Sequence, residues 1–369
     1  MRVAIDSGPL SSGHAVRGVG FSTKYLIDAI QRNNKDKSLK VDSVDFSITD
    51  LEKYDVLHAT SFNPFFVTLP ISYIEKTVVT IHDLIPLIYP KVYAPGLKGK
   101  ISVIRNENLL KIVKAIITVS ETSKKDIVRF FGIDQNKINV IYWGSRFGSS
   151  PDKGAKDVSF VKKKYKLPIK FILYVGDINY NKNIPILAEA CRISGITLVI
   201  VGKQARETDG LEYKLLKSLK GPQDFLRYLL DKPHPELLHI KKLKKIFESG
   251  NILRLGFIPT NELAAIYSLA TCYVQPSLYE GFGLPVLEAI ACETPVIVSK
   301  TQALMEITKG NVDSFSPSDS KELSNKINNV LNNPKDSKKL KGLHQEFSKY
   351  YSWDKTAEEH LKLYRNLSD

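Results

Sequence analysis

Short apolar runs rich in β-branched residues recur along the chain, and each is followed by a stretch whose apolar residues have helical spacing. In the first part of the chain the runs are Arg2–Asp6, Lys76–Ile81 and Ala115–Val119, and the helical stretches after them are Phe21–Ile30, Lys100–Lys114 and Glu121–Phe131. Strands that alternate with helices are typical of a parallel sheet covered by helices on both faces. The pattern therefore predicts an α/β protein with doubly wound sheets.

The alternation stops after Ile138–Tyr142, where the chain becomes rich in Gly, Ser, Asp and Lys, and it starts again near residue 170. The later apolar runs are Phe171–Val175, Thr197–Val201, Ile252–Leu255, Cys272–Gln275 and Pro295–Val298, and the clearest helical stretches are Ile184–Ile193, Glu262–Leu269 and Leu284–Cys292. We predict an N-terminal domain over 1–150, a linker over 151–169 and a C-terminal domain over 170–350. In such folds ligands bind at the carboxyl ends of the strands, so the expected site is the cleft between the domains.

One segment of the second domain is too long for an ordinary strand–helix connection. Residues 203–250 are rich in Lys and Leu and are interrupted by Pro222, Pro233 and Pro235. Connections in α/β units are usually 2–6 residues. We interpret 203–250 as a helical insertion whose role the sequence leaves open.

Composition limits the class of protein. The chain has 369 residues, a formal charge of +14 and three widely spaced cysteines. Three cysteines make no disulfide framework, and no apolar run reaches the roughly 20 residues of a membrane span, so we expect a cytoplasmic protein. The positive charge favours anionic partners such as phosphorylated small molecules or anionic lipid.

The strongest motif follows the run Cys272–Gln275. It reads Pro-Ser-Leu-Tyr-Glu-Gly-Phe-Gly-Leu-Pro-Val-Leu-Glu over residues 276–288, with Pro285 in the favoured first turn of a helix. Amides at such a helix start bind anions, and the glycines let a ligand approach the backbone closely. Glu280 and Glu288 supply two carboxylates that can each accept two hydroxyls, which suits a sugar. A turn with a capping glutamate is the simpler interpretation, and the order of these residues disfavours it.

This motif resembles the E-x7-E signature of retaining GT-B glycosyltransferases, and within them family 4 (glycosyl transferases group 1). The likeness extends over most of the chain: Met1–Asp6 with Gly18–Gly20, Tyr54–His58, Thr80–Leu84, Ile117–Ser123, Leu173–Asn183, Leu253–Pro259 and Tyr351–Ala357. The resemblance implies the GT-B fold, in which two Rossmann-like domains face each other across a cleft. It further implies that 351–369 form a closing helix that returns to the N-terminal domain.

The resemblance also implies residue roles. Glu288 would hold the ribose of a nucleotide donor and Glu280 the transferred sugar, while Lys182 would neutralise the diphosphate and His82 would face the donor sugar. The amides around that sugar and the phosphates would come from Gly281, Phe282, Gly283 and Leu284. Gly176 belongs to the diphosphate loop, and Gly18 with Gly20 would let the first loop close over the phosphates.

The implied reaction transfers a hexose from a UDP- or GDP-linked sugar to an acceptor hydroxyl with retention, without a cofactor. Fixed cations and amides stabilise a departing diphosphate. The chain contains no Asp-x-Asp, so we expect a metal-independent reaction and propose no metal ligands. A mannose-type donor and a role in cell-surface polysaccharide or glycolipid synthesis are favoured.

The chain departs from the family pattern in three places. Asp177 stands where the family commonly has an Arg, so it must turn away from the diphosphate or pair with a base. Glu293 replaces a usual glycine after the signature helix. The stretch 313–317 lacks a second glycine that the family usually has.

Other functions stay open. The main alternative is a catalytically silent scaffold that binds a nucleotide sugar, and phosphorylase or epimerase activity lies within the same fold. A nucleic-acid binder is disfavoured because no recognition motif is present. The expected partners are a nucleotide sugar and a glycan or lipid-linked acceptor. The stretch 98–129, with eight basic and three acidic residues, suggests peripheral contact with the anionic inner face of the membrane.

Overall fold

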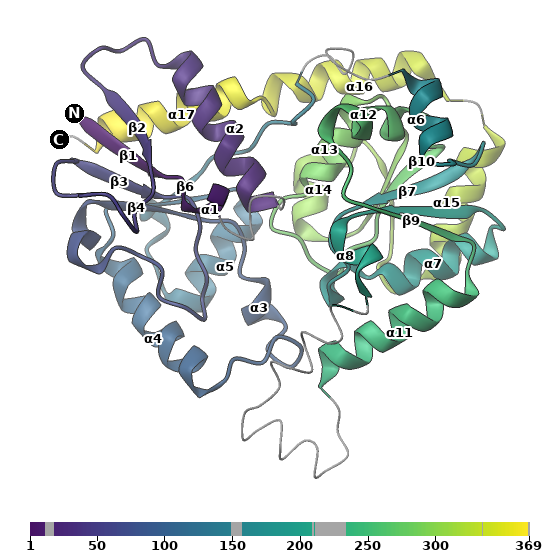
Figure 1. Ribbon diagram of the computed structural model, residues 1–369, viewed down its shortest axis with the longest axis horizontal. Helices are drawn as coiled ribbons and strands as arrows, with labels where there is room; N and C mark the ends of the chain where they lie inside the picture. Colours follow the sequence, from purple (N-terminus) through teal and green to yellow (C-terminus); the bar gives the residue numbers. More distant parts are fainter. Residues whose placement is uncertain (12–17, 149–156, 209, 211–233, 334, 368–369) are drawn as a thin grey trace. The chain divides into compact units, whose positions relative to one another are not determined.

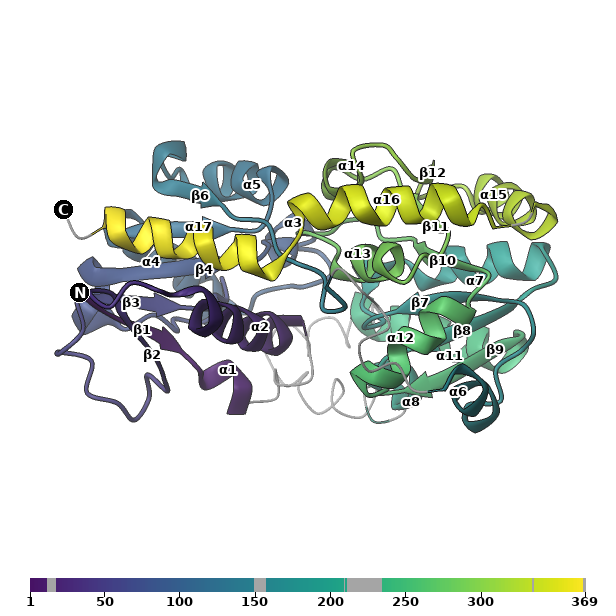
Figure 2. The same cartoon turned by 90° about the horizontal axis from the view of Figure 1, so that it is seen from above.

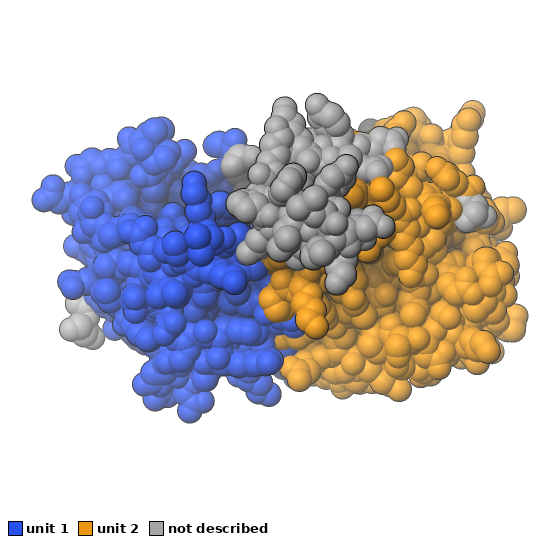
Figure 3. All heavy atoms as spheres, turned by 90° about the horizontal axis from the view of Figure 1, so that it is seen from below, with its two compact units in different colours: residues 1–88, 95–146, 348–369 blue, residues 89–94, 147–347 orange. Residues whose placement is uncertain are grey.

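The computed structural model describes residues 1–11, 18–148, 157–208, 210, 234–333 and 335–367. They form two compact units, coloured blue and orange in Figure 3. Unit 1 comprises residues 1–88, 95–146 and 348–369, and unit 2 comprises 89–94 and 147–347. Residues 89–94 thus belong to unit 2, although they lie inside the segment predicted as the N-terminal domain.

Unit 1 is built on a six-stranded sheet in the order β2-β1-β3-β4-β5-β6, and every neighbouring pair is parallel. Its strands are β1 (Arg2–Asp6), β2 (Lys40–Val44), β3 (Val56–Ala59), β4 (Thr77–Ile81), β5 (Ala115–Thr118) and β6 (Ile138–Val140). Its helices are α1 (Gly8–Ser11), α2 (Gly18–Asn33), α3 (Ile85–Ile88), α4 (Leu97–Ile112), α5 (Glu121–Phe131) and α17 (Trp353–Asn366), with 3-10 turns η1 (Ile71–Lys76) and η2 (Gln135–Lys137).

The direction of strand addition reverses between β1 and β3, so right-handed crossovers place helices on both faces of this sheet. In Figure 1, α2 and α17 lie on one face, and α4 and α5 on the other. Local signals fix the helix ends: the Ser120 side chain accepts a hydrogen bond from the Ser123 amide at the start of α5, and Gly132 ends that helix in the left-handed conformation.

Unit 2 has a second parallel sheet, in the order β12-β11-β10-β7-β8-β9. Its strands are β7 (Phe171–Val175), β8 (Thr197–Val201), β9 (Ile252–Gly256), β10 (Cys272–Gln275), β11 (Val296–Ser299) and β12 (Asp313–Phe315). Its helices are α6 (Val158–Lys164), α7 (Ile184–Ile193), α8 (Lys203–Arg206), α11 (Pro235–Ser249), α12 (Thr260–Leu269), α13 (Leu284–Ala291), α14 (Gln302–Thr308) and α15 (Ser320–Asn332), with the 3-10 turn η3 (Tyr180–Lys182). The boundary between the units falls within α16 (Ser337–Tyr350).

The core of unit 2 explains why these segments fold as they do. Alternate strand residues such as Ile172 and Leu198 pack against apolar residues of α7, α11 and α15, including Leu187, Leu243 and Leu323. α7 and α11 lie below the sheet in Figure 1, and α12 and α13 above it. Both faces are therefore covered, as the continuous apolar strands predict.

The predicted α/β class is confirmed, and the bounds of β1, β7, β8 and β10 match the predicted runs. Three expectations need correction or qualification. The predicted linker 151–169 contains α6, whose start is capped by the Asp157 side chain. The edge strands β2 and β12 were not predicted. Of the predicted insertion 203–250, the structure describes α8 and α11, while residues 209 and 211–233 lie outside the described residues.

The helix α17 packs on α2 in unit 1, as Figure 2 shows from above. The Trp353 ring stacks between Tyr25 and Trp143, with centroids 5.6 and 6.2 Å away. Farther along α17, the Tyr364 hydroxyl lies 2.6 Å from Nδ1 of His58, and His360 lies beside the same imidazole with ring centroids 5.6 Å apart. These contacts fix the last helix of the chain on the first sheet.

Burial lowers the pKa of three histidines in unit 1. The pKa of His58 lies well below its usual value, and the pKa values of His82 and His360 are lowered to about 4, in each case mainly by desolvation. Between about pH 6.5 and pH 4 the unfolded chain therefore binds protons that the folded chain does not. The stability from these groups is present above about pH 6.5 and is lost as the pH falls.

We expect unit 1 to lose about 1.4 kcal/mol per pH unit for each of these histidines over that window. Both tryptophans of the chain, Trp143 and Trp353, lie in unit 1, so urea unfolding followed by tryptophan fluorescence between pH 4.5 and 7.5 reports on this unit. The variant His360→Gln removes one of the three titrating groups. The dependence of the free energy of unfolding on pH should therefore weaken by about 1.4 kcal/mol per pH unit. A free energy of unfolding that does not change across this window would contradict the assignment.

Candidate active site

The signature loop lies where the order of strand addition reverses in unit 2. β7 and β10 are parallel neighbours at this point, and Tyr273 pairs with Leu173. The segment after β7 leads to η3 and α7, and the segment after β10 is 276–283, which leads to α13. Ligands of doubly wound sheets bind at such switch points, so the topology brings the two candidate loops to one edge.

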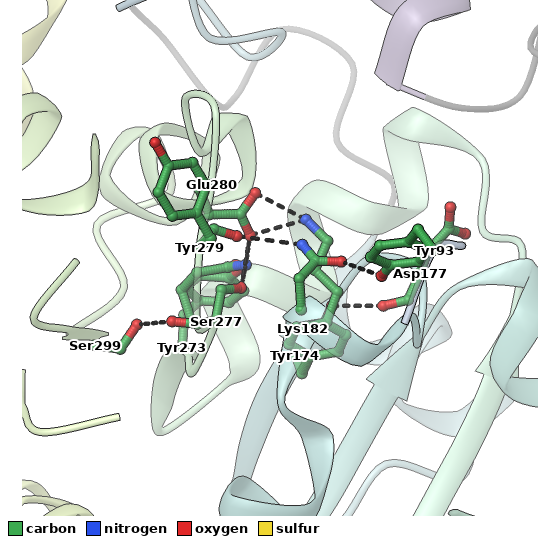
Figure 4. Close-up of polar contacts among 11 residues, drawn as sticks. Tyr93, Tyr174, Asp177, Lys182, Tyr273, Ser277, Tyr279, Glu280 and Ser299 are labelled. Carbon is green, nitrogen blue, oxygen red and sulfur yellow. Dashed lines mark hydrogen bonds and ion pairs between the residues drawn. The ribbon is translucent and has the colours of Figure 1, made fainter. Parts of the chain in front are cut away.

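A charged cluster joins these two loops. The Lys182 ammonium lies 2.8 Å from both carboxylate oxygens of Glu280 (Figure 4). The same carboxylate accepts hydrogen bonds from Nε2 of Gln275 at 2.7 Å and from the Ser277 hydroxyl at 2.6 Å. Only 6% of Glu280 is exposed, and a buried carboxylate needs such compensation. Two predicted site residues, Lys182 and Glu280, are therefore in direct contact.

The backbone of the two loops is joined as well. The Leu278 amide donates to the Asn181 carbonyl at 2.7 Å, and the Asn181 side chain donates to the Tyr279 carbonyl at 3.2 Å. The Tyr93 hydroxyl donates to the Asn181 side-chain oxygen at 3.0 Å. Sequence reasoning missed Asn181, Gln275 and Ser277, although Gln275 and Ser277 adjoin or lie in the predicted motif.

Glu288 lies in the first half of α13 and is buried, with 1% of the residue exposed. It accepts a hydrogen bond from the Tyr267 hydroxyl at 2.9 Å. The pKa of the Tyr273 hydroxyl is raised well above its usual value, first by burial and further by Tyr174, Glu280 and Glu288. The Tyr267 ring, whose hydroxyl donates to Glu288, lies 5.6 Å from the Tyr273 ring.

The backbone around the motif needs glycine. Gly283 has φ +118° and begins α13, and a Cβ there would lie 2.8 Å from Leu304 and 2.9 Å from Ile307. At the end of β8, a Cβ on Gly202 would lie 2.1 Å from the carbonyl oxygen of Gly176, which follows β7. Gly281, Phe282 and Gly283 are buried, while Leu284 is half-buried.

The variant Gly283→Ala should lower the free energy of unfolding of unit 2 by about 2–4 kcal/mol, because it combines a positive φ with overpacking. Gly342→Ala is the matched control, since nothing lies within 4 Å of a Cβ at that helical position. We expect this control to change stability by less than about 1 kcal/mol and in the stabilising direction. Thermal unfolding of the two variants tests the point, and equal transition temperatures would contradict it.

The Asp177 side chain does not point toward the Lys182 ammonium. Its carboxylate points away from the Lys182–Glu280 pair in Figure 4. The Tyr174 hydroxyl donates to the Asp177 backbone carbonyl at 2.6 Å and so fixes this turn. The Asp177 side chain therefore turns away from the lysine, which is one of the two arrangements that the sequence predicts.

His82 follows β4 in unit 1. Its Nε2 donates to the Thr60 carbonyl at 3.0 Å, and its ring lies 4.8 Å from the Trp143 ring. Nδ1 is buried and has no hydrogen-bond partner among the residues that the structure describes. Protonation of Nδ1 would place an uncompensated charge inside the protein. Desolvation therefore lowers the pKa of His82 to about 4, and the imidazole is neutral near pH 7.

The glycine loop of unit 1 needs a correction. Gly18 and Gly20 lie in the first turn of α2 and not in a loop. Gly18 is exposed and Gly20 is buried. The preceding residues 12–17 lie outside the described residues, so the role of these glycines stays a prediction.

Two features are absent from the part of the chain that the structure describes. No helix there is long and apolar enough to cross a membrane. No group of three or more His, Cys, Asp or Glu side chains there could hold a metal ion. The three cysteines are buried and form no disulfide bonds.

Two parallel doubly wound sheets, with a signature loop at the switch point of the second, define an α/β protein of the GT-B fold. Residues 156–345 match the family model for glycosyl transferases group 1, and residues 41–145 match that for glycosyltransferase family 4. The chain belongs to glycosyl transferases group 1.

Individual proteins agree with this assignment. The chain is 26% identical over 315 residues to the serotype-specific mannosyltransferase WbdA of Escherichia coli, covering 82% of this chain and 36% of that protein. It is 27% identical over 297 residues to the O-antigen chain mannosyltransferase B of Escherichia coli, covering 80% of this chain and 71% of that protein. Thus the chain spans about a third of the length of the first relative. Among solved structures, Anabaena Alr3699/HepE in complex with UDP and glucose matches with a TM-score of 0.67 at 16% identity, covering 99% of this chain and all of that one.

Proposed function

We propose that the protein transfers a hexose, with mannose favoured, from a UDP- or GDP-linked sugar to an acceptor hydroxyl in the synthesis of a cell-surface polysaccharide or glycolipid. Family membership and the names of the mannosyltransferase relatives support this reading. A structural neighbour that binds UDP and glucose supports a nucleotide-sugar donor. The observation that carries the proposal is the Lys182–Glu280 cluster at the switch point of unit 2.

In this proposal the donor lies against the carboxyl edge of the unit 2 sheet. Glu288 holds ribose hydroxyls, and Glu280, fixed by Gln275 and Ser277, holds hydroxyls of the transferred sugar. Carboxylate oxygens accept more than one hydrogen bond each, so both glutamates can serve a sugar while keeping protein partners. The glycine-rich backbone from Gly281 to Leu284, with Gly176 in the other loop, surrounds the sugar and the phosphates.

Lys182 is the leaving-group cation of the proposed reaction. As the bond between the anomeric carbon and the phosphate oxygen breaks, negative charge grows on the diphosphate, and a fixed ammonium stabilises it. An ammonium carries three donors, so Lys182 can serve a phosphate oxygen as well as Glu280. With Asp177 turned away, this lysine acts where the family commonly has two cations.

The proposal includes retention of configuration without a metal or cofactor. The acceptor oxygen bonds to the anomeric carbon on the face from which the diphosphate leaves, and the acceptor proton passes to the leaving phosphate oxygen. His82 is neutral at physiological pH, so it contributes hydrogen bonding and not charge. We place the activity in the cytoplasm, with peripheral contact at the inner face of the membrane.

A thermal-shift panel of nucleotide sugars tests donor binding. A true donor at about 100 times its dissociation constant should stabilise the protein by about 2.7 kcal/mol. Glu288→Gln and Lys182→Met should lose most of this stabilisation, and Lys182→Met should lower kcat by about 10²–10³-fold. The matched controls Glu293→Gln and Lys170→Met remove the same charges outside the proposed site and should behave like the wild type.

Two results would contradict the proposal. One is that no nucleotide sugar raises the transition temperature, and the other is that the site variants respond like the controls. The alternative of a catalytically silent scaffold predicts donor binding without transfer of labelled sugar to any glycan or lipid-linked acceptor, so the transfer assay separates the two functions.

A further inference from the structure

Helix α4 in unit 1 is apolar on two opposite sides. Its inner side is covered: Asn106 and Leu110 are buried, and Val103 packs against the core. On its outer side, Leu97, Ile101 and Ile104 are 73%, 50% and 61% exposed. The exposed side of a surface helix is normally polar, so exposed apolar residues on the outer side of α4 are suited to a partner.

The exposed apolar residues form one stripe. Leu97, Ile101 and Ile104 are four and three residues apart, which places them on one face of the helix. Asn108 and the exposed Ile112 continue the same line toward the end of α4. We call Leu97, Ile101, Ile104 and Ile112 the α4 stripe.

Basic residues border the α4 stripe on both sides. At 100° per residue, Lys98 and Arg105 lie on one flank, and Lys100 and Lys111 on the other. All four are exposed. The acidic neighbour Glu107 pairs with Lys111 at 2.7 Å, so the flanks keep a net positive charge.

The surroundings of α4 are held firmly. The buried Asn106 side chain lies 3.1 Å from the backbone carbonyls of Asn63, Pro64 and Phe66 and donates to them. These hydrogen bonds hold residues 63–66 against α4. Phe66, in that segment, is 65% exposed. η1, with the exposed Ile71, also packs beside α4. Figure 1 shows α4 at the outside of unit 1.

We propose that the α4 stripe docks on an anionic lipid bilayer, with α4 lying in the plane of the interface. Apolar side chains would enter the acyl boundary, and the flanking Lys and Arg side chains would extend to the lipid phosphates. Cations on both flanks fit a lipid surface better than a second copy of this chain, which would bring like charges together. The docking would give unit 1 access to a lipid-linked acceptor, and that last step rests on the proposed function.

Flotation of the full chain with vesicles tests the surface. We expect binding to vesicles of phosphatidylcholine with 30% phosphatidylglycerol at low salt, and weak binding to pure phosphatidylcholine. Ile101→Asn/Ile104→Asn and Lys98→Gln/Lys100→Gln/Arg105→Gln should each lower partitioning by about tenfold or more.

Matched controls lie in unit 2. Ile169→Asn changes an isoleucine that is 86% exposed, and Lys338→Gln/Lys339→Gln/Lys341→Gln removes three exposed charges; both should bind vesicles like the wild type. All variants should keep the donor-induced thermal shift, so a failure of docking is distinguishable from a failure of the proposed function.

Three outcomes would overturn the proposal. They are no binding of the wild type to anionic vesicles at low salt, unchanged binding of both α4 variants, and a dimer in light scattering that Ile101→Asn/Ile104→Asn converts to a monomer. The last result would assign the α4 stripe to self-association.

Discussion

The candidate site depends on how unit 2 stabilises one buried carboxylate. Glu280 is nearly inaccessible, and three donors from two loops converge on it: the Lys182 ammonium, the Gln275 amide and the Ser277 hydroxyl. Removing one partner from such a cluster typically costs several kcal/mol, because the remaining charge stays buried. The same contacts that satisfy this charge therefore hold the loops after β7 and β10 together.

This arrangement prepares the site before any ligand binds. Hydrogen bonds between Asn181, Leu278 and Tyr279 join the loops through the backbone, and Gly283 lets α13 begin where a larger residue would meet Leu304. Groups that are fixed in advance need little reorganisation when charge develops on a leaving diphosphate. The position of Lys182 is thus set by the fold and not by the local sequence.

The sequence predicted the elements whose signal is local. Buried, β-branched strands such as β7 and β8 appear as short apolar runs, and the signature residues have a fixed spacing. The edge strand β2 was missed because its sequence, Lys-Val-Asp-Ser-Val, is mostly polar and partly exposed, and β12 has only three residues. α6 was missed because Val161 alone is buried among lysines.

The supporting residues of the site could not be predicted, because polar side chains such as Gln275 and Asn181 carry no periodic signal. Only the pairing of β7 with β10 brings them together. The structure also bears on one departure from the pattern that the resemblance implies. Glu293, where that pattern has a glycine, adopts φ +53°, which is the left-handed conformation that glycine favours, so the backbone is strained at this residue.

A crystal structure of the full chain with the nucleotide sugar that stabilises it most would test the proposed donor site directly. We expect a phosphate oxygen within hydrogen-bond distance of the Lys182 ammonium, hydroxyls of the sugar on Glu280 and ribose hydroxyls on Glu288. A donor bound away from the loops after β7 and β10, with none of these three contacts, would contradict it.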